Sequence, residues 1–431
     1  MKRKEFLTLG GSLIMTSLLP GRLDVYEDTI GLTNDAENSL YQGSMELLGG
    51  MSLRKLLDYH RNYLMETYIP NWNRGVDWKY GGFVDELVPG REPDFELKSM
   101  YFQARAVWVF SYLYNHITKD TRHLEAAMKG RDFLKKNALT DDIRWISLMN
   151  RKGKSLSDPL NHYGDIYMIL GLTELYIATK DEGDLSLAIQ TAHSVMDRLV
   201  SPSYQQIGAH GSALEPGTHK VGDWIHLLSA LTPLLKLQRD PAIEKYARFC
   251  VRNICERHWK PEHGLLFELL DDQFQPFTFD ALNWGEPNLR HFNGWHCIQA
   301  SWMIMDEALR VKHYPTFRLG IDMGFSTLDK LYVDGKGIIT HGNPGYPEGG
   351  FKPWGALDEV LVFCLMVLEH SHDTAALKYY NKCFGLYNSK PENFQPECLL
   401  HVPRRFFFTI NILNRIIENK GRISGFWDDK T

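Results

Sequence analysis

The sequence has few cysteines, no long run of basic residues and no long apolar run. The six cysteines of the 431-residue chain lie between Cys250 and Cys398, and none forms a CxxC pair, so a zinc or redox site has little support. The formal net charge of −5 argues against nucleic acid as a partner. No apolar stretch reaches the roughly 18 residues that a membrane-spanning helix needs. The remaining class is a globular protein, and an apolar fraction of 44% is ample for a large core.

The first residues differ in character from the rest of the chain. A short basic start, Met1–Glu5, precedes a mostly apolar segment, Phe6–Leu19, which is the layout of an export signal. The segment resembles a degenerate twin-arginine signal, with Lys2 where the first arginine would stand. We therefore expect an export signal and linker over residues 1–30 and a periplasmic location. A disordered or helical N-terminal extension is the alternative. In an exported protein the cysteines could form a disulfide, but the sequence does not reveal the pairing.

A repeat of helical hairpins is the strongest pattern in the chain. Five segments share an apolar helix, a short polar turn that often contains Asp, and a second amphipathic helix; they centre near Tyr114, Tyr176, Lys236, Leu309 and Glu369. Their spacing of roughly 60 to 75 residues is longer than that of the common solenoid repeats. One more helix is expected before the first unit, over Leu53–Tyr68, and another after the last, over Arg404–Asn419.

The helices alternate between two kinds. The more apolar set begins near Lys98, Tyr163, Gly222, His296, Trp354 and Val402, and the amphipathic set is typical of a solvated outer ring. Six inner and six outer helices in alternation predict an all-α fold, an (α/α)6 barrel, as a single catalytic domain over residues 50–431. An open superhelical array is the alternative. Long loops rich in Gly, Pro and Trp precede the inner helices and favour the barrel, where they would gather at one end.

Polar residues stand at the starts of the expected inner helices. Gln103 and Arg105 interrupt an otherwise apolar helix, and a guanidinium there requires either a buried carboxylate or a bound ligand. His226, His296 and His401 occupy equivalent points of three other units. A single histidine in such a place is more often a core residue than a catalytic one, but three in a repeat indicate a common pocket. Helix N-termini carry partial positive charge, so a ring of them favours an anionic intermediate.

Five segments, in order and in register, resemble the N-acylglucosamine 2-epimerase family, which includes cellobiose 2-epimerases and mannose or sulfoquinovose isomerases. The segments are Asp77–Phe83, Gln103–Trp108, Trp224–Ala230, His296–Trp302 and His401–Arg404. The resemblance extends from about Leu53 to the end and implies the same barrel fold. It implies that His296 and His401 are the acid/base pair, with Arg105 and His226 as substrate-binding or supporting groups. Further substrate-binding positions expected on this basis are Gln103, Gln299, Trp302, Trp354, Glu359 and Arg404.

The implied chemistry is the epimerisation or isomerisation of a reducing sugar at C2. A base removes the C2 proton of the open-chain aldose and an acid returns one, through a cis-enediolate that Arg105 could support. Histidine, with an ordinary pKa near about 6.5, fills both roles near neutral pH. The expected partner is a small carbohydrate, and no metal or redox cofactor is needed. A homodimer is one of the assemblies that the sequence allows.

Three positions depart from the family pattern. Gln299 and Ser229 stand where the family has Glu, and Trp295 stands where it has Gly before the histidine. A carboxylate beside a histidine raises the pKa of that histidine, and an amide or hydroxyl does not. The departures predict a different sugar, a variant reaction or lost activity.

Two other functions fit the same fold. A glycoside hydrolase or lyase would need two suitably spaced carboxylates, and the acids expected near the mouth are Asp85, Asp223, Asp358 and Glu359. A carbohydrate-binding homologue without turnover would explain Gln299 and Ser229. Retention of all three histidines and both arginines, Arg105 and Arg404, argues against it.

Overall fold

The computed structural model describes residues 44–87, 91–204, 214, 216–277, 291–342, 353–371, 373–389 and 401–426. The expected export segment and Cys398 lie outside these ranges. The other five cysteines are free thiols, and four of them are buried. Among the described residues, none of the helices is both long and apolar enough to cross a membrane.

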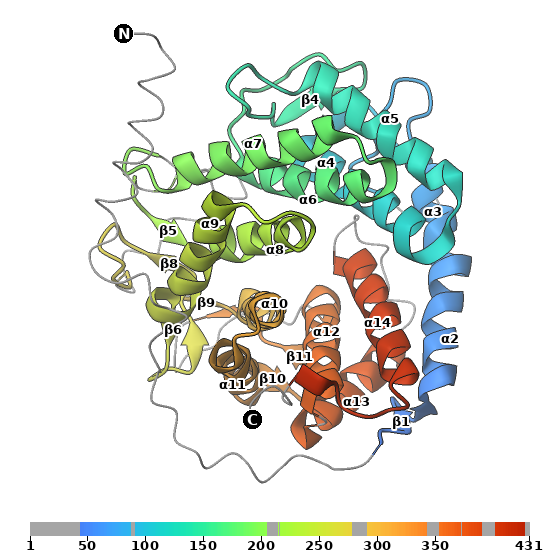
Figure 1. The fold of residues 1–431 in the computed structure, drawn as a ribbon, viewed down its shortest axis with the longest axis vertical. Coiled ribbons are helices and arrows are strands. Elements are labelled where there is room, and N and C mark those ends of the chain that lie inside the picture. The colour runs from blue at the N-terminus through green and yellow to red at the C-terminus, as the bar shows by residue number, and fades with distance from the viewer. Residues whose placement is uncertain are drawn as a thin grey trace.

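Six helices surround the middle of the molecule, and each is followed or preceded by an outer helix (Figure 1). The inner helices are α4 (Met100–Tyr112), α6 (His162–Thr179), α8 (Val221–Leu237), α10 (Gly294–Val311), α12 (Pro353–Ser371) and α14 (His401–Glu418). The outer helices are α5 (Thr121–Asn137), α7 (Glu182–Leu199), α9 (Pro241–Arg252), α11 (Tyr314–Leu331), α13 (Thr374–Asn388) and α2 (Leu53–Tyr63). The described residues also form the short helix α3 (Ile69–Arg74) and the π-helical turns η1 (Leu64–Tyr68), η2 (Leu113–Thr118) and η3 (Asn253–His258). The predicted alternation of inner and outer helices is confirmed.

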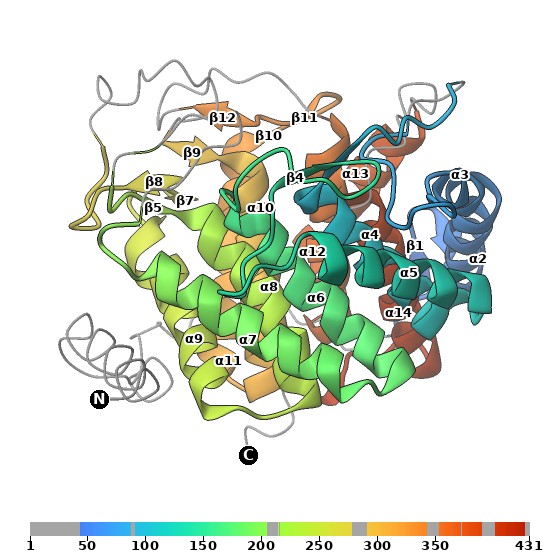
Figure 2. The same cartoon turned by 90° about the horizontal axis from the view of Figure 1, so that it is seen from above.

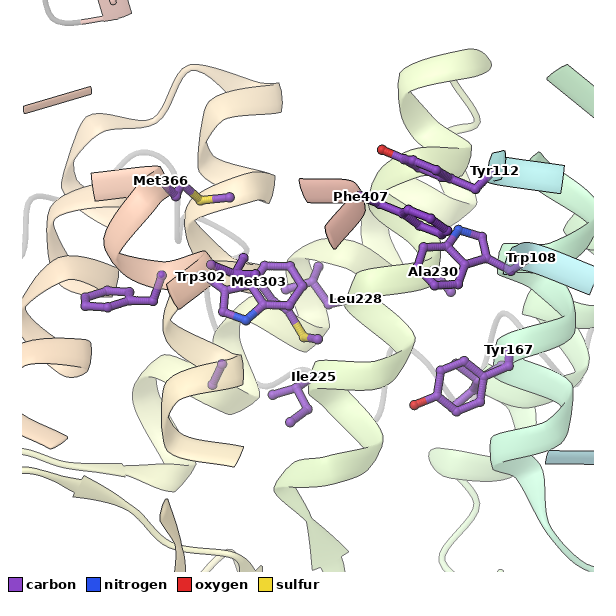
Figure 3. Packing of buried hydrophobic residues seen from close by; sticks show 14 of the residues in the cluster. Trp108, Tyr112, Tyr167, Ile225, Leu228, Ala230, Trp302, Met303, Met366 and Phe407 are labelled. Atoms are coloured by element: carbon purple, nitrogen blue, oxygen red, sulfur yellow. The ribbon is translucent and has the colours of Figure 1, made fainter. Parts of the chain in front are cut away.

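The ring is closed, which decides between the barrel and the open array. Each inner helix contacts the next from α4 to α14, and α2 covers α14. Across the remaining gap, Tyr112 of α4 stacks on Phe407 of α14 with ring centroids 4.6 Å apart, and Asn411 Nδ2 donates a hydrogen bond to Tyr112 Oη at 2.5 Å. Figure 3 shows Phe407 beside Tyr112 and Trp108. The first and last inner helices therefore meet.

The Asp residues in the hairpin turns begin the outer helices. Asp120, Asp181, Asp240 and Asp373 are the N-caps of α5, α7, α9 and α13, and each side chain accepts a hydrogen bond from a backbone N–H of the first turn. Such a cap stabilises a helix by about 1 kcal/mol. This is the physical reason why the polar turn recurs in the sequence.

Short antiparallel strand pairs lie at one end of the barrel (Figure 2). They pair β3 (Leu97–Ser99) with β4 (Leu148–Asn150), β5 (His219–Lys220) with β8 (Leu269–Leu270), β9 (Phe292–Asn293) with β12 (His341–Gly342), β6 (Trp259–Lys260) with β7 (Leu265–Leu266), and β10 (Tyr332–Val333) with β11 (Gly337–Ile338). A sixth pair, β1 (Leu47–Leu48) with β2 (Met51–Ser52), lies elsewhere, directly before the outer helix α2 and near the C-terminal end of α14. Because β3, β5 and β9 lead directly into α4, α8 and α10, the inner helices begin at the strand end. This arrangement brings the polar helix starts together.

Candidate active site at the strand end of the barrel

Arg105 lies in α4 between two tyrosine rings. Its side chain is buried, and Cζ is 3.4 Å from the ring centroid of Tyr101 and 4.3 Å from that of Tyr167 in α6. Within the part of the chain that the structure describes, no carboxylate forms an ion pair with Arg105. Of the two partners that the sequence allowed, a buried carboxylate and a ligand, the described structure supplies no carboxylate. A buried guanidinium without a counter-charge is a binding group for electron-rich oxygen atoms.

His226 connects Arg105 to His296. A hydrogen bond of 3.2 Å joins its Nδ1 to Tyr167 Oη, and its ring meets the His296 ring edge-on with centroids 5.7 Å apart. Burial raises the pKa of Tyr167, while the charges of Arg105 and Arg404 act in the opposite direction. The phenol therefore stays protonated near neutral pH. Arg105, Tyr167, His226 and His296 come from α4, α6, α8 and α10, so four inner helices supply one connected polar lining.

His296 is held by a carboxylate from a strand segment. It is the third residue of α10, and its Nδ1 lies 2.8 Å from Oε2 of Glu268, which stands between β7 and β8. Burial raises the pKa of Glu268, but the charge and hydrogen bond of His296, with Lys220 and His258, outweigh it, so the pKa lies below its ordinary value. Glu268 is thus an ionised acceptor.

A glycine leaves room beside the His296 ring. A Cβ on Gly222 would lie 2.9 Å from Tyr163 Oη and 3.2 Å from His296 Cε1. A side chain at this point of α8 would therefore collide with the ring edge that carries Cε1. The pocket needs glycine here for close approach rather than for a special backbone angle.

A second polar group lies deeper in α10, α12 and α14. Glu359 accepts a hydrogen bond from Trp302 Nε1 at 2.8 Å and pairs with the Arg404 guanidinium. With its amide oxygen turned toward them, Gln299 accepts from Arg404 Nη2 at 2.8 Å and from Trp295 Nε1 at 3.3 Å. Gln299 therefore contacts Arg404 rather than His296, although it is only three residues from His296.

His401 and Trp354 stand at helix starts. His401 is the first residue of α14, one turn before Arg404, and Trp354 is the second residue of α12. Their side chains lie outside what the structure describes. Their backbone positions are the predicted ones, at the same ends of the inner helices as the other site residues.

Gln103 is occupied by the neighbouring loop. Its Oε1 accepts from Phe83 N at 2.8 Å, and its Nε2 donates to Phe83 O at 2.7 Å and to Asp85 Oδ1 at 3.0 Å. The buried amide therefore fixes the Gly82–Asp85 segment. Both polar atoms of the Gln103 amide are bonded to this loop, whereas the sequence led us to expect them to contact the substrate.

The acids expected near the mouth are also engaged. Asp223 pairs with His162 at 2.8 Å, Asp358 pairs with Arg405 at 2.6 Å, and both oxygens of Asp85 accept from Ser99 N. Burial, which the bonds to Ser99 and Gln103 only partly offset, raises the pKa of Asp85 to about 7.

Among the described residues, no cluster of three or more His, Cys, Asp or Glu side chains is arranged to hold a metal ion.

Four site residues escaped the sequence analysis: Tyr163, Tyr167, Lys220 and Glu268. Of these, only Glu268 carried a usable signal, since it is a lone acid within the apolar run Leu265–Leu270. An acid in a buried strand needs a partner. The tyrosines of α6 are indistinguishable by periodicity from ordinary core residues.

Comparisons with known proteins agree with the motif resemblance. No family model matches the chain. The cellobiose 2-epimerase of Dictyoglomus turgidum is 25% identical over 276 residues, which cover 60% of this chain and 67% of that protein. The N-acylglucosamine 2-epimerase of Mus musculus is 23% identical over 328 residues, 71% of this chain and 74% of that protein. The resemblance stated from the five segments is therefore confirmed at the level of sequence relatives.

Solved structures show the same fold. The structure of cellobiose 2-epimerase from Bacillus thermoamylovorans superposes with a TM-score of 0.70 at 16% identity and covers 83% of this chain and 99% of its own. That of a D-mannose isomerase gives 0.68 at 14% identity, with 85% and 98% covered. The predicted barrel is confirmed.

Proposed function

We propose that this chain, a sequence relative of the cellobiose and N-acylglucosamine 2-epimerases, epimerises or isomerises a reducing sugar at C2. The observation that carries the proposal is the lining that runs from the uncompensated Arg105 through Tyr167 and His226 to His296, at the end where the inner helices begin. The chain is accordingly an isomerase that acts on carbohydrates.

The reaction divides between two histidines. One histidine takes the C2 proton from the open-chain aldose, and the electron pair of the C–H bond forms the C1–C2 double bond of a cis-enediolate. In epimerisation the other histidine returns a proton to the opposite face of C2, and the C1 carbonyl forms again. In isomerisation a proton goes to C1 instead, and the proton of the O2 hydroxyl passes to O1, which leaves the carbonyl at C2. His296 and His401 are the proposed pair. Because the proton leaves and returns without a change in total oxidation state, the proposal requires no redox cofactor.

Arg105 is the proposed stabiliser of the enediolate. Negative charge develops on O1 and O2 as the proton leaves, and a preorganised cation in a buried site stabilises that charge more than it stabilises the neutral sugar. His226, Trp302 and Arg404 are proposed to bind the sugar, together with Gln299, Glu359 and Trp354. Gln103 contributes through the loop that it holds.

Two alternatives are weaker. Hydrolysis needs a protonated acid and a free carboxylate. Asp223, Asp358 and Glu359 are each paired with His162, Arg405 or Arg404. Asp85, whose pKa is raised to about 7, is held by Ser99 N and Gln103 Nε2, and none of the other three acids is a free carboxylate beside it. A binding protein without turnover would gain nothing from a histidine held by an ionised glutamate. Both alternatives therefore leave the His296–Glu268 pair and the uncompensated Arg105 without a role.

Exchange of the C2 proton for deuterium tests the proposal. The protein is incubated in D2O with cellobiose, N-acetylglucosamine and D-mannose, and proton NMR follows the C2 signal and the appearance of the epimer or ketose. We expect exchange with at least one sugar, a loss of about 10³-fold or more in His296→Asn and His401→Asn, and no loss in His263→Asn, which changes an exposed histidine. Binding of the sugars by calorimetry without any exchange would contradict the proposal, and release of new reducing ends from oligosaccharides would favour hydrolysis.

We further propose export to the periplasm, which rests on the basic and apolar character of Met1–Leu19. Fractionation of cells that express the full chain, with and without Lys2→Gln and Arg3→Gln together, tests it. Equal distribution of both forms in the cytoplasm would contradict export.

A further inference from the structure

We propose that Glu268 is the positioning residue of His296: it holds the ring by Nδ1 and leaves Nε2 as the atom that exchanges protons with the sugar. Glu268 thereby supplies from a strand segment the carboxylate that residue 299 does not supply. The effect on catalysis rests on the proposed function, but the claim that Glu268 holds Nδ1 of His296 does not.

The first observation is that Glu268 is rigidly placed. Its side chain is 2% exposed, its N–H donates to His291 O at 2.6 Å, and its carbonyl accepts from Val221 N at 2.9 Å. The strand β8 that follows pairs with β5, directly before α8. The backbone at Glu268 is therefore fixed on both sides by hydrogen bonds that do not involve His296, and the carboxylate starts from a defined position.

The second observation is the orientation of the imidazole. With Nδ1 bonded to Glu268 at 2.8 Å, the far edge of the ring, which carries Nε2 and Cδ2, is directed away from the carboxylate. Cε1 borders the space that Gly222 leaves open, and the His226 ring lies edge-on to the same imidazole. No hydrogen bond joins His296 Nε2 to another group in the described ranges. The nitrogen that remains available faces the polar lining.

The third observation is the charge around the pair. The groups that face it are Lys220 before α8, His226 in α8, Tyr163 in α6 and His258 in η3. Burial raises the pKa of the Tyr163 hydroxyl, and burial lowers the pKa of His258 to about 4. Both are therefore neutral near pH 7. An ionised Glu268 accepts the Nδ1–H, which makes Nε2 the unprotonated nitrogen of the neutral ring.

The fourth observation explains the departure from the family pattern. Gln299 is on the helix that carries His296, but its oxygen is directed to Arg404 and Trp295. A glutamate at 299 is consequently not required to hold His296, because Glu268 already occupies Nδ1. The amide at 299 does not imply lost activity.

Two variants of matched size test the proposal. Glu268→Gln keeps an acceptor oxygen for Nδ1–H but loses the charge, and Glu268→Leu removes both. In protein labelled with ¹⁵N-histidine, NMR reports which nitrogen carries the proton; the His296 signals are those absent in His296→Asn. We expect the Nδ1–H form with a far-downfield proton in the unmodified protein, the same form with an upfield-shifted proton in Glu268→Gln, and a mixture of both forms in Glu268→Leu. Glu262→Gln, which changes an exposed glutamate in the turn before β7, is the control.

The activity arm separates positioning from a merely structural role. A carboxylate that orients a functional histidine through its other ring nitrogen typically contributes about 10–100-fold, so kcat of C2 exchange should fall by that factor in Glu268→Leu with little change in KM. In Glu268→Gln the acidic limb of the pH–rate profile should move to lower pH by about one unit, since the imidazolium loses its counter-charge. Unchanged ¹⁵N signals in both variants would overturn the proposal. If Glu268→Leu fails to fold, the proposal is tested by two measurements on Glu268→Gln: the chemical shift of the Nδ1 proton and the position of the acidic limb of the pH–rate profile. If the unmodified protein exchanges the C2 proton of no sugar, the proposed function fails. The ¹⁵N NMR measurement still shows whether Glu268 sets which nitrogen of His296 carries the proton.

Discussion

The guanidinium of Arg105 lies on the ring of Tyr101, with Cζ 3.4 Å from the ring centroid. Stacking of this kind replaces part of the hydration that a buried cation loses, but it does not neutralise the charge. The buried cation lowers the folding stability of the barrel, and a group that costs stability is typically retained because it has a function.

Replacing Arg105 by Met should therefore separate activity from stability. We expect kcat/KM of C2 exchange to fall by about 10²–10³-fold, the effect of removing one group that stabilises developing negative charge. The melting temperature should stay equal or rise, because a buried charge without a carboxylate partner disappears.

Arg198→Met is the matched control for Arg105→Met. Arg198 pairs with the buried Asp165 at 2.5 Å, so its loss leaves a carboxylate uncompensated and should cost about 3–5 kcal/mol in unfolding free energy. A loss of stability in Arg105→Met as large as that in Arg198→Met, with normal turnover of the folded fraction, would show that Arg105 is structural.

Gln103 is expected to act on stability. Gln103→Leu leaves Phe83 N and Phe83 O without their partners, and at about 1–3 kcal/mol for each unsatisfied buried group the unfolding free energy should fall by about 2–6 kcal/mol. Urea unfolding measures this loss. Gln190→Leu, on the exposed side of α7, should change it by less than about 0.5 kcal/mol. An unchanged stability with a raised KM would instead indicate direct contact with substrate.

The sequence was informative where the signal is local. The starts of α4, α8 and α10 and the Asp-containing turns before the outer helices follow from helical periodicity and turn composition, which involve residues a few positions apart. The partner of His296 was not predictable in this way. Glu268 is 28 positions earlier and reaches His296 only because β8 pairs with β5, and no rule of spacing encodes that pairing.

A pattern of residue spacing also could not show that Gln103, which we expected to bind substrate, is bonded to the backbone of the chain itself. A polar residue in an apolar helix signals that it has a partner, but not whether the partner is a ligand or the chain itself. For Gln103 the partner is the backbone of Phe83, and for Arg105 the described chain provides only aromatic rings. The two residues are two positions apart in sequence and have different roles.

His60 should make the fold sensitive to acid. It is buried in α2 against Phe384 and Phe406, and neither ring nitrogen has a hydrogen-bond partner in the described structure. Burial, and to a smaller extent the charge of Arg405, lowers the pKa of His60 well below 6.5. The unfolded chain therefore binds a proton at a higher pH than the folded one. Stability from this group is complete above about pH 6.5 and is lost as the pH falls toward the folded pKa, by up to about 1.4 kcal/mol for each pH unit.

His60→Leu removes this term, so its unfolding free energy should fall less steeply than that of the unmodified protein between about pH 6.5 and 5. Chemical denaturation at several pH values measures the slope, and His263→Leu, an exposed site, should leave the slope as it is. Parallel slopes for the unmodified protein and His60→Leu would mean that His60 is protonated in the fold.

Gln299→Glu restores the acid that the family pattern has at this position, and its outcome distinguishes two explanations of the departure. The side-chain oxygen of residue 299 faces two donors, Arg404 Nη2 and Trp295 Nε1, so a carboxylate can accept the same bonds. Glu359 already pairs with Arg404, and repulsion between the two acids should offset the stronger bond. We expect a melting temperature within about 4 °C of the unmodified protein and an acidic limb of the pH–rate profile that does not move, because Glu268 holds His296 in both proteins. Gln299→Leu, which removes the acceptor of both bonds, should lose about 1–3 kcal/mol. A Gln299→Glu limb that moves to higher pH would show that residue 299 acts on the catalytic histidine, and the carboxylate of Glu268 would then not be the one that tunes it.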